Sequence, residues 1–554
     1  MKQQIDYRLP LIFIGGLLFQ YLFWEEFLGL NLLIYTLFIF IITLTDKGIP
    51  FHKNKVYTAL PHLSIAIYIS YNNSNLATVT WFITLFIYLG TLHFPLLKSA
   101  VTAMLLGVLQ AVSGPYGIFT KLQATTLGKI NFKPLIKPIK YVVLPLLMVI
   151  IFCTLYSTAN PIFAKYTQLI ADSITLFFTQ IFNFLFIDIS IPKCLLILLG
   201  IFITAGLIVG IKSKLLAEIE LEENDQLTRK RSDKKTSWFL QDFRILLAGN
   251  QTQKILALKT ENTVGIICFI MLNLLLMLLN GIDIYTLWLN NVGTTKNFSA
   301  ALHDGTTTLI FSIVFAMLII VYFFSGNLNF YKQNKWIKLL AYIWIAQNAF
   351  LVASVFHRDY DYIVYHGLTY KRIGVAVFAT LSLVGLVTVY LKVAQQKTVF
   401  YLYRLNAKVW YLLIIVLSFI NWDVFIVRYN LAKADKIGVD VDHLMSFSDK
   451  TLPILNENRN FLLRHVVIEA ENNKQTYGKT ETTDSVVKLA DSEMIKPQLS
   501  DAELKAQRIK QAKDYFNQEL DDRIDRFLKQ QKSVSWLSFS YLEWKAVENL
   551  KKKN

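Results

Sequence analysis

Residues 357–372, HRDYDYIVYHGLTYKR, form the most conspicuous polar stretch between the late apolar segments of the sequence. Two histidines, three basic residues and two aspartates lie there between two long apolar runs. Histidine combined with aspartate is an ordinary ligand set for a divalent cation. This stretch therefore raises the hypothesis of a metal, ligand or ion site.

Other ionisable residues are predicted to lie at the same level, because they flank neighbouring apolar runs. The candidate cluster is His303, Asp304, His357, Arg358, Asp359, Asp361, His366, Arg372, Asp423 and Arg428. Charges near a bilayer core are costly unless they serve a function or pair with one another. No close metal motif such as His-Glu-x-x-His occurs in the sequence. We therefore leave the metal unknown and assign no catalytic residue or cofactor.

The preferred interpretation of this cluster is structural pairing at helix ends. In that interpretation Gly367 makes a turn, Thr369 caps the next helix, and Arg372 pairs with Asp359, Asp361 or Asp423. The competing interpretation remains a ligand site facing the outside of the membrane.

Four amides lie inside the predicted spans 263–282 and 336–356: Asn273, Asn280, Gln347 and Asn348. They could line a transport pathway, but neutral amides in membrane helices more often bond to a neighbouring helix. No predicted span holds a central acidic or basic residue, and no Gly-rich phosphate loop occurs. These features disfavour a proton pump and an ATP-driven machine.

The composition of the sequence indicates that the helices which hold these residues lie in a membrane. Apolar residues make up 54% of the 554 residues and charged residues 17%, and the apolar residues form long blocks. Residues 263–282, for example, carry no charge over the length that a helix needs to cross the hydrocarbon core. Because only helices or closed barrels satisfy the backbone in lipid, and these blocks are long rather than alternating, we predict helices.

The net charge of +17 is explained by position rather than by a nucleic-acid partner. Lysines and arginines fall mostly in short connectors, as the positive-inside rule predicts, and no nucleic-acid-binding motif accompanies them. Cys153, Cys194 and Cys268 lie in apolar segments without metal-ligand spacing. They indicate neither a disulfide framework nor a zinc site.

The hydropathy pattern predicts about eleven spans. Their expected ranges are 9–24, 27–45, 56–71, 76–94, 138–158, 193–212, 263–282, 303–325, 336–356, 372–392 and 408–427. Residues 97–113 are shorter and less apolar, and we interpret them as a helix at the cytoplasmic face or a re-entrant helix. Counting lysines and arginines then puts the N-terminus in the cytoplasm and the C-terminus outside it.

The longest internal connector, residues 213–262, contains a basic run with Arg229, Lys230, Arg231, Lys234 and Lys235. Such a run can dock on anionic lipid. The preferred interpretation is that the positive charge of this run sets the membrane topology of the neighbouring helices.

From residue 430 the composition becomes that of a soluble region, with a polar linker near 470–496. After Pro497, Ser500 and Glu503 form a capping box, and one long amphipathic helix follows. Its expected apolar face is Leu504, Ala512, Phe516, Leu520, Ile524 and Phe527, with Glu519 and Arg523 among the expected i,i+4 pairs. The face is interpreted as packing surface. The last stretch, with Trp536, Phe539 and Trp544, could cap this region or touch the membrane surface.

Two short motifs resemble those of an uncharacterised family of multi-spanning bacterial membrane proteins known only as a domain of unknown function. The first is Gly-Leu-Thr-x-x-Arg, matched by Gly367, Leu368, Thr369 and Arg372. The second is Asn-x-Asp-x-x-Ile-x-Arg-x-Asn, matched by Asn421, Asp423, Ile426, Arg428 and Asn430. His366 and Trp422 depart from the family pattern. The resemblance implies a bacterial membrane protein but no activity.

Together these observations predict an all-α, polytopic membrane protein of the bacterial inner (cytoplasmic) membrane with a small helical C-terminal soluble region. We expect N-terminal membrane helices over 1–113, a basic loop with two spans over 114–212, the cytoplasmic loop 213–262, a five-span core over 263–429 and the tail 430–554. The favoured function is a non-enzymatic envelope scaffold or sensor with a protein partner. The alternatives are a transporter or channel between the late spans and a membrane enzyme using the outer His/Asp cluster.

Overall fold

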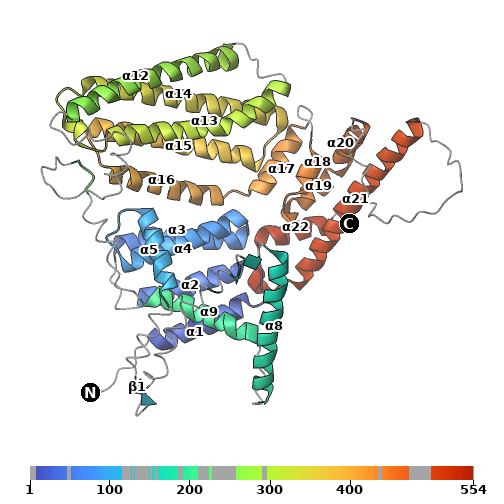
Figure 1. Ribbon diagram of the computed structural model, residues 1–554. Coiled ribbons are helices and arrows are strands. Elements are labelled where there is room, and N and C mark those ends of the chain that lie inside the picture. The colour runs from blue at the N-terminus through green and yellow to red at the C-terminus, as the bar shows by residue number, and fades with distance from the viewer. Residues whose placement is uncertain are drawn as a thin grey trace. The chain divides into compact units, whose positions relative to one another are not determined.

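The computed structural model is helical throughout most of the chain (Figure 1). The residues that it describes are 8–45, 52–114, 126–127, 130–131, 149, 153–154, 156–157, 160–184, 191–209, 224–227, 257–289, 296–434, 439–472 and 501–552.

The chain forms two compact units, and each contains segments that are distant in the sequence. The first unit combines Met1–Asp225, Tyr403–Phe419 and Val534–Ser540. The second combines Gln226–Leu402, Ile420–Ser533 and Tyr541–Asn554.

The first unit begins with α1 Arg8–Phe23, α2 Leu30–Thr45, α3 Lys53–Tyr71, α4 Asn75–His93 and α5 Ala100–Val112. The antiparallel strand pair β1 Thr126–Leu127 and β2 Ile130–Asn131 follows, and then α8 Pro161–Phe184 and α9 Ile191–Ile208. It also receives most of α16 Val399–Ser418 and the 3-10 turn η6 Trp536–Ser538.

The second unit contains α12 Ala257–Asp283, which continues into the π-helix η2 Ile284–Leu289. It also contains α13 Lys296–Phe323, η4 Asn327–Phe330, α14 Lys335–His366, α15 Tyr370–Gln395 and α17 Trp422–Ala432. The shorter and later helices are α18 Val441–Met445, η5 Asp449–Thr451, α19 Leu452–Glu457, α20 Arg459–Asn472, α21 Asp501–Ser533 and α22 Tyr541–Lys551.

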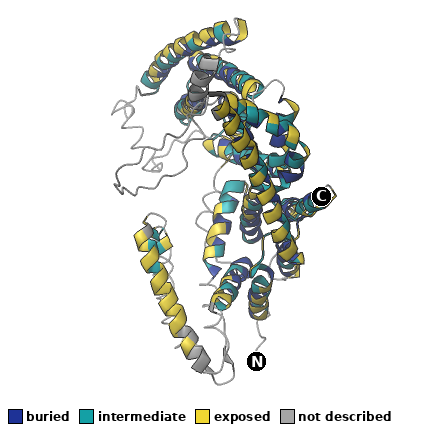
Figure 2. Cartoon of the chain, turned by 90° about the vertical axis from the view of Figure 1, so that its right-hand side faces the viewer, coloured by how far each residue is buried: buried dark blue, intermediate teal, exposed yellow. Residues whose placement is uncertain are grey.

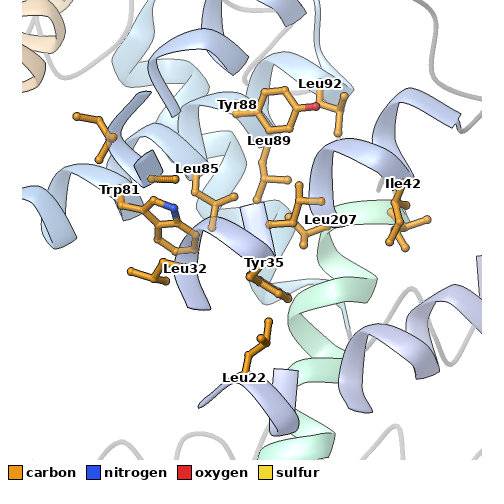
Figure 3. Close-up of a cluster of buried hydrophobic side chains, with 14 of the residues drawn as sticks. Leu22, Leu32, Tyr35, Ile42, Trp81, Leu85, Tyr88, Leu89, Leu92 and Leu207 are labelled. Atoms are coloured by element: carbon orange, nitrogen blue, oxygen red, sulfur yellow. The ribbon is translucent and has the colours of Figure 1, made fainter. Parts of the chain in front are cut away.

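The core of the first unit lies between α1–α4 and α9. Its buried side chains converge as Figure 3 shows, and include Leu22, Leu32, Tyr35, Ile42, Trp81, Leu85, Tyr88, Leu89, Leu92 and Leu207. Threonines satisfy the polar atoms of the aromatic residues: the Trp81 indole donates to Thr36 Oγ1 over 2.9 Å, and Tyr88 Oη lies 2.6 Å from Thr43 Oγ1. Leu537, from the far end of the chain, belongs to the same core.

Two glycines let α4 and α5 pack with their backbones nearly touching. A Cβ atom at Gly90 would lie 1.9 Å from the Ala103 carbonyl oxygen, and one at Gly107 would lie 1.8 Å from that of Phe86. The 13 residues of α5 extend about 20 Å, which is shorter than a hydrocarbon core of about 30 Å. The re-entrant or surface location expected for 97–113 stays a prediction.

The second unit has two hydrophobic clusters. The first lies among α12, α13, α14 and α15 and contains Phe269, Ile320, Phe324 and Val352. The second, the tail core, joins Leu368, Ile426 and Val427 to side chains of α18–α22. Ala512, Phe516, Leu520, Ile524 and Phe527 of the expected apolar face of α21 are buried in the tail core. That part of the face is therefore packing surface, as predicted.

The all-helical architecture is confirmed, and it contains helices that are candidates to span a membrane. Among the described residues, five helices are long and apolar enough to cross a membrane: Asn75–His93, Leu258–Leu289, Lys335–His366, Tyr370–Gln395 and Val399–Ser418. Five shorter apolar helices accompany them: Arg8–Phe23, Leu30–Thr45, Ala100–Val112, Pro192–Ile208 and Thr308–Phe323. The number of eleven spans and the orientation of the termini remain predictions.

Two expected span ends differ in the structure. α14 continues through the polar residues to His366, because nothing before Gly367 stops a helix. The apolar run after residue 408 does not continue to 427, since α16 ends at Ser418 and a new helix, α17, begins at Trp422. Asn421 initiates α17, and its side chain accepts a hydrogen bond from the Val424 amide at 3.4 Å.

Several expectations fall on residues outside the described part. They are most of the span 138–158, the basic run 229–235, nearly all of the linker 470–496, and Ser500 of the capping box.

Candidate functional site

The turn between α14 and α15 is only three residues long, Gly367–Thr369. Gly367 has φ +82° and ψ 176°, a region that is essentially restricted to glycine. Its amide donates to the Ile363 carbonyl over 2.9 Å. Thr369 occupies the N-cap position of α15 but makes no capping hydrogen bond with its side chain. The expected turn is thus present, whereas the expected Thr369 cap is not.

Asn430 of α17 holds this turn through its amide group. Its Oδ1 accepts from the Leu368 N–H over 2.6 Å, and its Nδ2 donates to the Leu368 carbonyl over 2.9 Å. One side chain thereby satisfies both backbone polar groups of the buried residue Leu368. We call this arrangement the Asn430 clamp. It brings together one residue from each of the two motifs.

The clamp depends on the missing side chain of Gly367. A Cβ at Gly367 would lie 2.7 Å from Asn430 Oδ1. We expect Gly367→Ala to lower the free energy of unfolding by about 1–3 kcal/mol for backbone strain alone, with the clash in addition. Denaturant titration in micelles measures this loss. Gly374→Ala in α15 is the matched control, because its Cβ would meet nothing within 4 Å, and we expect no loss. Equal losses in both variants would contradict this assignment.

Tyr370 and Asp423 form a second link between the turn and α17. The Tyr370 hydroxyl donates to Asp423 Oδ1 over 2.5 Å. Lys450 of η5 is also electrostatically coupled to Asp423, and its Nζ lies 3.7 Å from Glu543 Oε1 of α22. Burial lowers the pKa of Lys450, while the charges of Glu543 and Asp423 oppose that shift. Asp423 therefore belongs to a network that reaches the last helix.

Arg372 stacks on an aromatic ring. Its guanidinium lies 4.1 Å from the centroid of the Tyr362 ring, which in turn stacks on His366 with 4.4 Å between centroids. Asp359, which is buried, interacts electrostatically with Arg372. Of the three aspartates considered for Arg372, Asp359 is the one with a described interaction.

Arg358 forms an ion pair with Asp283, the last residue of α12. Their side chains are only 10% and 2% exposed, so this pair is shielded from solvent. His357 is the residue before Arg358, and its Nδ1 lies 3.0 Å from Oδ2 of Asp361, one turn further along α14. The His357 ring lies 5.0 Å from the ring of Trp288. The polar face of α14 is thereby tied to the end of α12.

The structure brings together most, but not all, of the ten predicted residues. Arg358 pairs with Asp283 in the interior, Arg372 stacks on Tyr362 and interacts electrostatically with Asp359, His357 pairs with Asp361, His366 stacks on Tyr362, and Asp423 bonds to Tyr370. Arg428 is exposed on α17. His303 and Asp304 lie on α13, and their side chains are outside the described part. Within the described part, no group of three or more His, Cys, Asp or Glu side chains is arranged to hold a metal ion.

The sequence-based selection missed Asp283, Tyr362, Tyr370 and Asn430 as members of the site. Asn430 could have been included, because it ends the second motif. Asp283 ends a long uncharged run, and a lone carboxylate at the end of such a run needs a partner.

The four membrane amides bond mainly to one another and to the backbone. Gln347 Nε2 donates to Asn273 Oδ1 over 2.9 Å, and Asn273 and Asn280 donate to the Leu340 and Gln347 carbonyls over 3.1 and 3.2 Å. The three residues therefore join α12 to α14. Asn348 donates to the Trp344 carbonyl of its own helix over 2.8 Å.

Arginines join the tail helices to one another. Arg523 of α21 donates to Asp449 over 2.5 Å and to the Phe447 carbonyl over 2.8 Å. The expected Glu519–Arg523 pair is therefore replaced by a longer-range one, because the guanidinium can satisfy backbone carbonyls there as well. Arg459 of α20 pairs with both carboxylate oxygens of Asp521.

We expect the stability of the tail core to depend on pH through Glu469 on α20. Burial raises the pKa of its carboxyl group, and Asp440 and Asp442 raise that pKa further. Such a group stabilises the fold most below the ordinary glutamate pKa, and the contribution is lost as pH rises through the raised pKa. We expect Glu469→Gln to unfold at a higher temperature than wild type at neutral pH, with the difference closing in acid.

Thermal unfolding of the intact protein across pH checks this expectation. Glu471→Gln is the matched control on the same helix, because Glu471 makes an exposed ion pair of 3.5 Å with Lys505, and such pairs contribute little. A pH profile of Glu469→Gln parallel to that of wild type would contradict the assignment.

Comparison with known proteins identifies a family but no activity. The family model described as "Domain of unknown function (DUF4153)" matches residues 29–458, which include both motifs and the Asn430 clamp. No curated protein and no solved structure matches the sequence. Because the match covers more than half of the chain, the protein belongs to the DUF4153 family of domains of unknown function.

Proposed function

We propose that this protein is a non-enzymatic scaffold or sensor of the bacterial inner membrane, in which the helical tail binds a protein partner. The observation that carries this proposal is the Asn430 clamp, because it fixes the start of the tail to the turn between two membrane helices. A tail attached in this way moves with α14 and α15 rather than as an independent tether.

The pairing of the polar residues supports this role over an enzyme. Arg358 bonds to Asp283, and Tyr370 bonds to Asp423. Arg372 stacks on the Tyr362 ring and interacts electrostatically with Asp359. Residues that are used in this way hold helices together, whereas a catalytic group must have an open position for a substrate.

The transporter alternative rests on the amides of α12 and α14. Asn280 Oδ1 and Gln347 Oε1 are buried and have no hydrogen-bond partner among the described residues, so they could contact a solute. The bonds that join Asn273, Asn280 and Gln347 favour a structural role instead. Solute flux into proteoliposomes that was lost in Gln347→Leu would support the transporter.

Contacts within the first unit support an outer location for the tail. Glu26, in a connector that lacks lysine and arginine and is therefore expected outside, accepts hydrogen bonds from Ser535 and Ser538, both over 2.5 Å. Because residues 534–540 join α21 to α22, the ends of both helices are expected on that side. An impermeant maleimide should label a Trp544→Cys variant of a cysteine-free chain in intact cells. Labelling only after lysis would overturn the proposed orientation.

A photocrosslinking experiment tests the scaffold or sensor role. A photoreactive residue at Trp544 or Tyr515, which are 49% and 58% exposed, should give a discrete crosslinked partner. The crosslink should be weakened in Asn430→Ala and retained in the control Asn458→Ala. If a chain that lacks residues 459–554 supported the same partners and phenotype, the proposal would fail.

A further inference from the structure

Helix α8 of the first unit is exposed along most of its described length (Figure 2), and the exposed residues include a row of apolar side chains. Ile162, Tyr166, Ile170 and Phe177 are 69%, 63%, 59% and 59% exposed. Their spacing of four and seven residues puts them on one side of a helix. An apolar face of this extent needs a partner or a lipid environment.

The opposite face of α8 is polar and carries little net charge. Lys165, Gln168, Asp172 and Thr175 lie there, and all four are exposed. The side chain of Asn160 caps the helix, accepting from the amides of Ile162 and Phe163 over 2.9 and 3.3 Å. The helix thus starts at a defined position and has two distinct sides, which is the pattern of a helix lying in a membrane interface.

The short connection to α9 keeps the C-terminal end of α8 near the start of that helix. Six residues separate Phe184 from Ile191, so the end of α8 lies within about 25 Å of the start of α9. Near that start, Lys193 lies 5.3 Å from the ring of Trp24, and tryptophan and lysine are typical of the headgroup level. α9 is one of the apolar helices, so its polar start marks the interface.

A crossing orientation does not fit α8. Asp172 lies midway along its 24 residues and would reach the bilayer centre, where a carboxylate is among the most costly side chains. In the interface plane, the same residue faces water. We propose that α8 is an interfacial anchor whose Ile162–Tyr166–Ile170–Phe177 face inserts among the lipids. Its small net charge indicates that zwitterionic lipid suffices.

Spin-label accessibility in the full chain tests this proposal. The three native cysteines are replaced, and single cysteines are introduced by Tyr166→Cys, Ile170→Cys and Phe177→Cys for the apolar face. Gln168→Cys, Asp172→Cys and Thr175→Cys are the matched positions on the polar face. The protein is placed in phosphatidylcholine nanodiscs, and Leu274→Cys in α12, which is 62% exposed, calibrates a lipid-facing position.

We expect oxygen to relax the apolar-face labels and a water-soluble nickel chelate to relax the polar-face labels, with all apolar-face labels at one shallow depth. Depth that increased steadily toward residue 172 would show a crossing helix and overturn the proposal. Exclusion of both reagents from the apolar face would show a protein partner or second copy there, and nickel access to both faces would show a helix in water. Either result would also overturn it.

Discussion

Asn430→Ala is expected to destabilise the protein by about 2–6 kcal/mol. The substitution leaves the amide and the carbonyl of Leu368 without their partners, and each buried unsatisfied group costs about 1–3 kcal/mol. Leu368 is 7% exposed, so water cannot readily replace the lost bonds. Denaturant titration of the purified protein in micelles measures the loss.

Asn458→Ala is the matched control for this substitution. Its Nδ2 donates to the Ile454 carbonyl over 2.8 Å in the same part of the chain, so the variant removes one local bond. We expect a loss of about 1 kcal/mol. If the Asn430 and Asn458 variants were equally stable, the clamp would not hold the turn.

Arg358→Met is expected to cost about 3–5 kcal/mol, because it leaves the buried Asp283 carboxylate without its partner. Replacing both residues, as Asp283→Leu with Arg358→Met, should recover most of that loss, since apolar side chains of similar volume can replace a buried pair. Such recovery would identify the pair as structural.

Arg404 provides the control for this pair. It bonds to Asp225 Oδ2 over 2.5 Å, with side chains 24% and 33% exposed, so Arg404→Met should cost less than about 1 kcal/mol. A double Asp283/Arg358 variant that folded well but lost its biological role would instead show that the pair has a function beyond stability.

Hydropathy predicted where most of the described helices lie, because a bilayer selects long apolar runs. Hydropathy did not predict where the helices end, because a helix can continue through polar residues and stops where the backbone conformation changes. The HRDYDY sequence is polar and suggested a connector, yet α14 continues through it, since Arg358 pairs with Asp283, His357 pairs with Asp361, and Tyr362 stacks on Arg372 and His366. The helix ends where Gly367 adopts a conformation that other residues resist.

The sequence predicted that several of the candidate residues lie near one another, but not which contacts they make. The sequence indicated that several ionisable groups lie together, and structural pairing was the preferred interpretation. It did not reveal that Arg358 meets Asp283 or that Arg372 stacks on Tyr362. Those pairings depend on the register between helices that are distant along the chain, and register is set by packing rather than by periodicity.

The central structural claim is that the two motif segments, around Gly367 and Asn430, form one clamp. A double-mutant cycle of Gly367→Ala and Asn430→Ala tests it most directly, with the free energy of unfolding as the measured quantity. We predict that Gly367→Ala costs less in the Asn430→Ala background, because the clash with Oδ1 is gone, giving a coupling of at least about 1 kcal/mol. If the losses of the two single variants sum to the loss of the double variant within about 0.5 kcal/mol, the result contradicts the claim.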